Sequence, residues 1–122
     1  MVESALREYI RATNTHDFKE VAKCLHPSAM YWFSDETCTS LEDIKMYFER
    51  AWKAMPDEVY RANEIVWLSK DMKSASCTYS YHYEGHINGI LTVGNGRATN
   101  VFIFVEDQWK LIHEHLSPSP NE

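Results

Sequence analysis

Two histidines stand two residues apart in the last β-prone segment of the chain, which runs from Trp109 to Ser117. Side chains two apart in a strand share one face, so the imidazoles of His113 and His115 are expected to point the same way. An imidazole titrates near neutral pH and can serve as a general base or bind a ligand by hydrogen bonding. The pair is therefore the first candidate for a functional site.

A two-residue turn at Glu106 and Asp107 would bring Asn100 onto the same face as these histidines. It pairs Asn100 with His113, and the face is then apolar near the turn and polar at the far end. The sequence predicts a pocket edged by Asn100, His113 and His115. We expect His115, which lies farther from the turn, to be the candidate catalytic base. For His113 the alternative is a structural hydrogen bond to the backbone.

A histidine pair at this spacing also suits a metal ion, provided that another segment delivers further ligands. His82, Glu84 and His86 share one strand face and are the candidates. The register of that strand against His113 does not follow from the sequence. We therefore predict no metal and no other cofactor.

Aromatic residues are more numerous than a small core requires, and buried Tyr and Trp side chains usually need a polar partner. A cavity lined by rings and a few polar groups would supply such partners. We expect Tyr9, Trp32 and Tyr81 to line it, although rings of this kind also fill cores and dimer faces. Arg97 either anchors a ligand or forms a cross-strand pair with Glu114.

Composition limits the possible partners. The chain has 122 residues with 18 acidic and 12 basic side chains, a formal net charge of -6, and the basic residues are scattered. Nucleic acid is therefore not an expected partner. No apolar run approaches the roughly 20 residues of a membrane helix, so we expect no membrane association and a cytoplasmic location. The cysteines Cys24, Cys38 and Cys77 have no CxxC spacing, which indicates neither a disulfide framework nor a zinc knuckle.

The order of elements predicts an α+β fold in one domain, residues 1–122. Apolar residues at helical spacing predict helices over residues 4–13, from Asp17 to Leu25, and from Ser40 to Met55. Residues 29–33 are expected to form a short strand. Four longer strands are expected over residues 59–68, 75–87, 98–105 and 109–116, paired as an antiparallel meander. Residues 88–96 contain three of the four glycines and fit either a loose hairpin or the beginning of a strand.

The segment Trp109-Lys-Leu-Ile-His-Glu-His-Leu-Ser117 resembles the closing strand of the association domain of calcium/calmodulin-dependent protein kinase type two. The segment from Asp43 to Trp52 is similar to the third helix of that domain. The chain is thus identified as a member of the nuclear transport factor 2-like superfamily, among its SnoaL-like small proteins. The resemblance implies a cone-shaped fold, with three N-terminal helices packed in a curved antiparallel sheet, and a homodimer formed through the outer sheet face.

Departures from the superfamily restrict the function that the resemblance implies. Asn100 replaces an arginine of the kinase domain, and Phe33 stands near the position of the catalytic aspartate of steroid isomerases. Phenylalanine cannot abstract a proton, so steroid isomerase activity is not expected. We predict a protein that binds a small molecule in an aromatic-lined cavity. The alternatives are an isomerase, dehydratase or cyclase with a histidine base, and a homo-oligomeric protein-association module.

Overall fold

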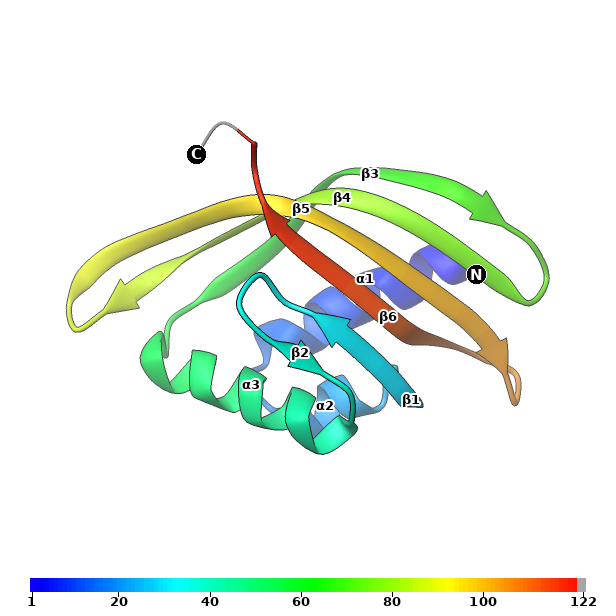
Figure 1. The fold of residues 1–122 in the computed structure, drawn as a ribbon, viewed down its shortest axis with the longest axis horizontal. Coiled ribbons are helices and arrows are strands. Elements are labelled where there is room, and N and C mark those ends of the chain that lie inside the picture. The colour runs from blue at the N-terminus through cyan, green and yellow to red at the C-terminus, as the bar shows by residue number, and fades with distance from the viewer. Residues whose placement is uncertain (121–122) are drawn as a thin grey trace.

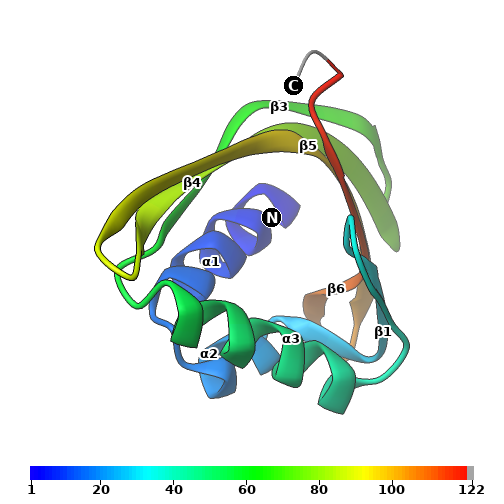
Figure 2. The ribbon, with the colours of Figure 1, turned by 60° about the vertical axis from the view of Figure 1, so that its left-hand side comes forward.

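A curved six-stranded sheet wraps around the helices in the computed structural model, which describes residues 1–120. Figure 1 shows the helices on one side of the sheet, and Figure 2 shows the sheet curving over α1 and α3. The helices are α1 (Val2–Asn14), α2 (Phe18–Ala22) and α3 (Leu41–Ala54). The strands are β1 (Leu25–Trp32), β2 (Thr37–Cys38), β3 (Val59–Lys70), β4 (Ser74–Ile87), β5 (Ile90–Val105) and β6 (Gln108–Pro118). The α+β fold class predicted from the sequence is confirmed.

Local capping explains where two of the helices begin. The carboxylate of Asp17 accepts a hydrogen bond from the backbone N–H of Lys19 at the start of α2. The Ser40 hydroxyl accepts one from the backbone N–H of Asp43 at the start of α3. Such side-chain acceptors satisfy N–H groups that have no partner within the helix. Both helix starts agree with the sequence prediction.

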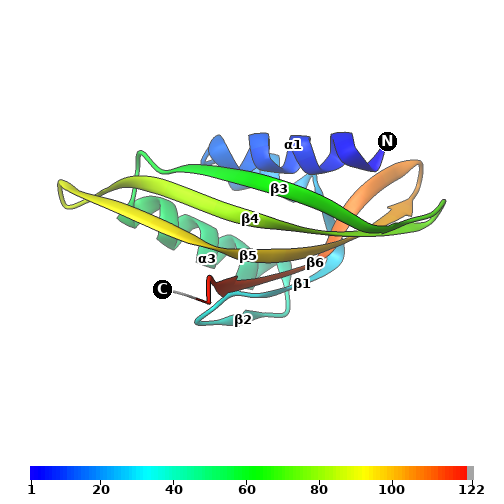
Figure 3. The same ribbon diagram turned by 90° about the horizontal axis from the view of Figure 1, so that it is seen from above.

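The strand order is β2-β1-β6-β5-β4-β3, and the four long strands form the expected antiparallel meander. Figure 3 shows these strands lying side by side along the sheet. The prediction of a purely antiparallel sheet is wrong in one pair, because β1 runs parallel to β6. The two strands are far apart in the chain, so their pairing has no local sequence signal.

The β4–β5 hairpin shows the structure of residues 88–96, for which the sequence allowed two alternatives. Residues 90–96 belong to β5, which pairs with β4 without interruption from Ile87–Ile90 to Ser74–Ile103. The turn consists of Asn88 and Gly89, both at positive φ. This is the geometry that favours two-residue hairpin turns. The hairpin is therefore tight and extends the sheet beyond the helices.

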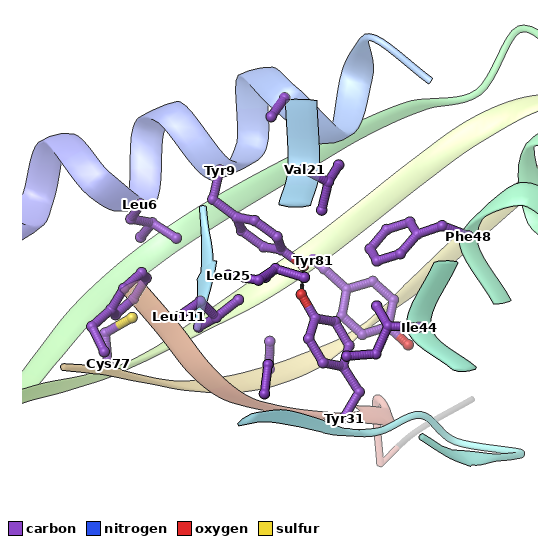
Figure 4. Packing of buried hydrophobic residues seen from close by; sticks show 14 of the residues in the cluster. Leu6, Tyr9, Val21, Leu25, Tyr31, Ile44, Phe48, Cys77, Tyr81 and Leu111 are labelled. Atoms are coloured by element: carbon purple, nitrogen blue, oxygen red, sulfur yellow. Dashed lines mark hydrogen bonds between the residues drawn. The ribbon is translucent and has the colours of Figure 1, made fainter. Parts of the chain in front are cut away.

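Buried side chains from the helices and from the concave face of the sheet form one cluster. Figure 4 shows Leu6 and Tyr9 of α1, Ile44 and Phe48 of α3, and Tyr31 of β1 within it. The cluster is rich in tyrosine, and its hydroxyl groups need partners inside the protein. No helix formed by residues 1–120 combines the length and the apolar character needed to cross a membrane.

Candidate ligand-binding cavity

A cavity of about 490 Å³ opens between α3, the C-terminal end of α1 and the concave face of the sheet. This volume lies within the range of roughly 300–1,000 Å³ that is typical of small-molecule sites. Most of the lining groups are aromatic or aliphatic, and the polar ones are hydroxyls and carboxyls. The lining residues are Tyr9, Thr13, Phe33, Ser34, Asp35, Tyr47, Phe48, Ala51, Trp52, Ala54, Met55, Glu58, Tyr60, Tyr81, Tyr83, Ile87, Glu114 and Leu116.

Three tyrosine rings lie in a row along the sheet side of the cavity. Tyr60 stacks on Tyr81 with ring centroids 5.9 Å apart, and Tyr81 stacks on Tyr83 at 6.3 Å. The cross-strand partners of Tyr81 and Tyr83 are Gly96 and Gly94. A Cβ atom added at Gly96 would lie 2.3 Å from the Tyr81 ring. Glycine at these positions lets the rings lie flat over the neighbouring strand, which explains the glycine-rich segment.

Glu114 of β6 lies at the floor of the cavity and is only 2% exposed. Its Oε1 atom accepts hydrogen bonds from Asn100 Nδ2 at 3.3 Å and from the Tyr79 hydroxyl at 3.4 Å. Burial raises the pKa of Glu114 to about 7, although the hydrogen bonds from Tyr9, Asn100 and Tyr79 partly oppose the increase. Near neutral pH this carboxyl can therefore either donate or accept a proton.

Further tyrosine hydroxyls extend the polar floor around Glu114. The hydroxyls of Tyr9 and Tyr31 are 2.7 Å apart, and the two rings point toward each other in Figure 4. The hydroxyls of Tyr60 and Tyr79 are 3.2 Å apart. Burial also raises the pKa of each of these four tyrosines well above its usual value, so they are neutral and act as hydrogen-bonding groups.

A second carboxyl, Glu58, lines the cavity at the junction between α3 and β3. Burial alone raises the pKa of Glu58 to about 7. The neighbouring His16 contacts the backbone carbonyl of Glu58, with its Nε2 at 2.9 Å, and not the carboxyl group. No side chain among residues 1–120 forms an ion pair with Glu58.

The structure brings three of the predicted site residues to the cavity or its floor. Tyr9 and Tyr81 line it as expected. Asn100 is fully buried beneath the cavity, where it donates to Glu114. The place of Glu114 in the cavity was not predicted from the sequence. One sequence signal was available. Glu114 and Leu116 are two residues apart in a strand, so they share one face, and Leu116 is apolar.

The expected placement of His113 and His115 on the cavity face is wrong. The predicted register holds from Val105–Gln108 to Phe102–Leu111, but the next pair is Val101–His113. Ile112 is therefore an extra residue in β6, a β-bulge. A one-residue shift exchanges the two faces of a strand. Glu114 consequently points inward, and His115 is exposed on the outer face.

Trp32 and Arg97 also lie outside the cavity. In β1 the inward position belongs to Tyr31, which is 0% exposed, so the next residue, Trp32, turns outward and is 44% exposed. Its ring packs edge-on against both His113 and His115, with centroids 5.2 Å apart in each case. Arg97 is exposed opposite Ser117. The expected pairing of Arg97 with Glu114 is thus wrong, because Asn100 occupies the position opposite Glu114.

The outer-face histidines have structural partners. His113 Nδ1 lies 2.8 Å from the backbone carbonyl of Met30, which confirms the structural alternative for this residue. His82 contacts Asn95 and Glu84, and His86 contacts Asp57. Within residues 1–120, no three histidine, cysteine or acidic side chains gather in an arrangement that could hold a metal ion.

Comparisons with known proteins agree with this architecture. The fold is the nuclear transport factor 2-like, or cystatin-like, cone. The SnoaL-like domain family matches residues 2–122, and the chain belongs to this family. No curated protein shows significant sequence similarity to the chain.

Several solved structures share the fold at low sequence identity. One from Xanthomonas campestris, named after the association domain of calcium/calmodulin-dependent protein kinase II, has a TM-score of 0.87 and 22% identity, covering 99% of this chain and 87% of that one. A nuclear transport factor 2-like protein from Salmonella enterica has a TM-score of 0.89 and 13% identity, covering 97% and 88%. A protein from Novosphingobium aromaticivorans named after scytalone dehydratase has a TM-score of 0.85 and 12% identity, covering 97% and 81%.

Proposed function

We propose that the protein binds a small, mostly apolar molecule in the cavity between α3 and the concave face of the sheet. The observation that carries this proposal is the cavity itself, about 490 Å³ lined largely by aromatic rings. Rings bury large areas of an apolar ligand, and the few polar groups orient it. The carboxyls of Glu58 and Glu114 and the hydroxyl of Tyr9 are the polar groups available for that purpose.

Filling the cavity tests this function. Ala51 of α3 lines the cavity, whereas Met46 of the same helix is 54% exposed and does not. In A51W the indole should occupy ligand space, while M46W adds the same ring outside. Binding of the neutral dye Nile red, measured by fluorescence, should fall by about tenfold or more in A51W and stay near wild type in M46W. Equal binding by A51W and wild type would disprove the cavity site, provided that both variants keep the wild-type circular dichroism.

Catalysis is the second candidate function, and the observation favouring it is Glu114. A carboxyl with a pKa of about 7 on the wall of an apolar cavity suits general acid–base chemistry. Structural neighbours named as dehydratases have the same fold. If the protein is an isomerase, dehydratase or cyclase, its base is Glu114 and not the exposed His115.

The protein-association alternative requires an exposed apolar patch in place of an open cavity, and the cavity argues against it as the main function. We propose a homodimer formed through the outer face of the sheet, as the names of the association-domain neighbours suggest. Sedimentation velocity at micromolar concentration tests the dimer. A monomer under those conditions would contradict it.

A further inference from the structure

We propose that the ligand of this cavity is a cation, specifically a primary ammonium carried on an aromatic or alkyl body, and that the Glu58 carboxylate is its counter-ion. This inference rests on the proposed ligand-binding function and names the chemical class of the ligand. It follows from the charges, rings and unpaired polar atoms that line the cavity.

The charged groups of the lining are all acidic. Asp35, Glu58 and Glu114 contribute carboxyls, and the lining contains no lysine, arginine or histidine. An anionic ligand would lose its hydration without gaining a counter-charge, which is a large cost in an apolar site. A cation would also lose its hydration, but it would gain a carboxylate as counter-charge. The cavity therefore selects against carboxylates and phosphates.

The three carboxyls differ in their partners. Asp35 accepts a hydrogen bond from the Tyr47 hydroxyl at 2.9 Å, and Glu114 accepts from Asn100 and Tyr79. Glu58 has no ion-pair partner within residues 1–120, and two residues near it make other contacts. His16 contacts its backbone carbonyl, and Asp57 binds both the backbone N–H and the ring of His86. Glu58 is thus the carboxyl with capacity for a ligand.

A second unpaired group lies at the same end of the cavity. Thr13 lines the cavity and is 5% exposed, and its buried Oγ1 atom has no hydrogen-bond partner among residues 1–120. Asn14, the next residue, makes two hydrogen bonds to the backbone of Tyr60, which holds the end of α1 beside the start of β3. These bonds place the end of α1, with Thr13, near the beginning of β3, which follows Glu58. An ammonium group has three N–H donors, so it can bind the Glu58 carboxylate and still donate to a second oxygen.

Aromatic faces complete a cation site. Tyr60, Tyr81 and Tyr83 form the stacked row on the sheet side, and Trp52 lines the helix side. The face of a tyrosine or tryptophan ring attracts a cation, most strongly where water is excluded. Burial without a counter-charge also keeps the pKa of Glu58 at about 7. A bound ammonium would favour the ionised form of this carboxyl and lower its pKa.

Three probes of similar shape and different charge test the proposal by calorimetric titration at about pH 8. They are 2-phenylethylamine, which is an ammonium at that pH, neutral propylbenzene, and anionic 3-phenylpropanoate. We expect the ammonium to bind about tenfold or more tightly than propylbenzene, and the anion to bind least tightly. Glu58→Gln should remove the preference for the ammonium over propylbenzene.

Thr13→Val provides a second variant, because it replaces an unpaired buried hydroxyl with a methyl group of the same size. It should weaken binding of the ammonium several-fold without lowering the melting temperature. Equal affinities for ammonium and propylbenzene, or an unchanged preference in Glu58→Gln, would overturn the cation proposal alone. Failure of all three probes and of Nile red would instead overturn the proposed binding function.

Discussion

Glu114→Gln replaces a buried ionisable group with little change in shape. In the folded state the carboxyl is buried, and Asn100 donates to its Oε1 atom. The Oδ1 atom of Asn100 is buried and has no hydrogen-bond partner in the part of the chain that the structure describes. Glutamine keeps a carbonyl oxygen as acceptor for Asn100 and adds an N–H group that can donate to that Oδ1 atom. We expect the variant to fold and to lose only the titration.

The size of the effect follows from the two pKa values of Glu114. Burial raises the pKa in the folded state to about 7, against 4.5 for a free glutamate. Because the folded pKa is higher, the folded state holds the proton more tightly, and the stabilisation is complete below about pH 4.5. It is lost as pH rises to about 7. A separation of about 2.5 pH units at about 1.4 kcal/mol each corresponds to about 3 kcal/mol.

Urea unfolding of wild type and Glu114→Gln between about pH 4.5 and 8 measures this difference. The free energy of unfolding of the variant should rise relative to wild type by about 3 kcal/mol across the interval, since other titrating groups cancel in the comparison. Glu58→Gln should show a change in the same direction, because burial raises the pKa of Glu58 to about 7 as well. A difference that stays constant with pH would show that Glu114 is not held neutral by burial.

Two further substitutions test the face assignment of the strands. Gly96→Ala places a methyl group 2.3 Å from the Tyr81 ring and 2.4 Å from the Ser117 carbonyl oxygen, so thermal denaturation should show a loss of about 1–3 kcal/mol; a melting temperature equal to wild type would contradict this packing. His115→Leu alters an exposed side chain outside the cavity, so Nile red binding should not change; a tenfold loss would return this residue to the site.

Much of the fold could be predicted from the sequence because its signals are local. The apolar spacing from Leu41 to Ala54 and the Ser40 cap define α3. The Glu106–Asp107 turn was placed correctly because two-residue hairpins have few alternatives. The parallel pairing of β1 with β6 had no such signal. Its partners are far apart in the chain, and Met30–His113 contacts depend on how the helices pack.

The candidate site was predicted only in part, and one residue accounts for most of the difference. Alternation along β6 was correct on both sides of Ile112, but the bulge at that position exchanges the faces. The bulge leaves one residue, Ile112, unpaired, and no residue type in this segment distinguishes it from a regular strand. Similarly, Tyr31 and Trp32 are both aromatic, and the choice of the inward residue depends on the register of β1 against β6. Tyr9 and Tyr81 were found because their own elements are regular.

Glu58 and Glu114 line the same cavity, but we expect only Glu58 to act as the counter-ion of a ligand. Burial raises both pKa values to about 7, but hydrogen bonds oppose this effect at Glu114 and not at Glu58. Asn100 and Tyr79 already stabilise the ionised form of Glu114, so a cationic ligand adds less there than at the unpaired Glu58. Ammonium binding should therefore release a proton mainly from Glu58. In calorimetry at about pH 7, where Glu58 still holds a proton in part, the dependence of binding enthalpy on buffer ionisation should disappear in Glu58→Gln and persist in Glu114→Gln, and the reverse result would assign the counter-ion to Glu114.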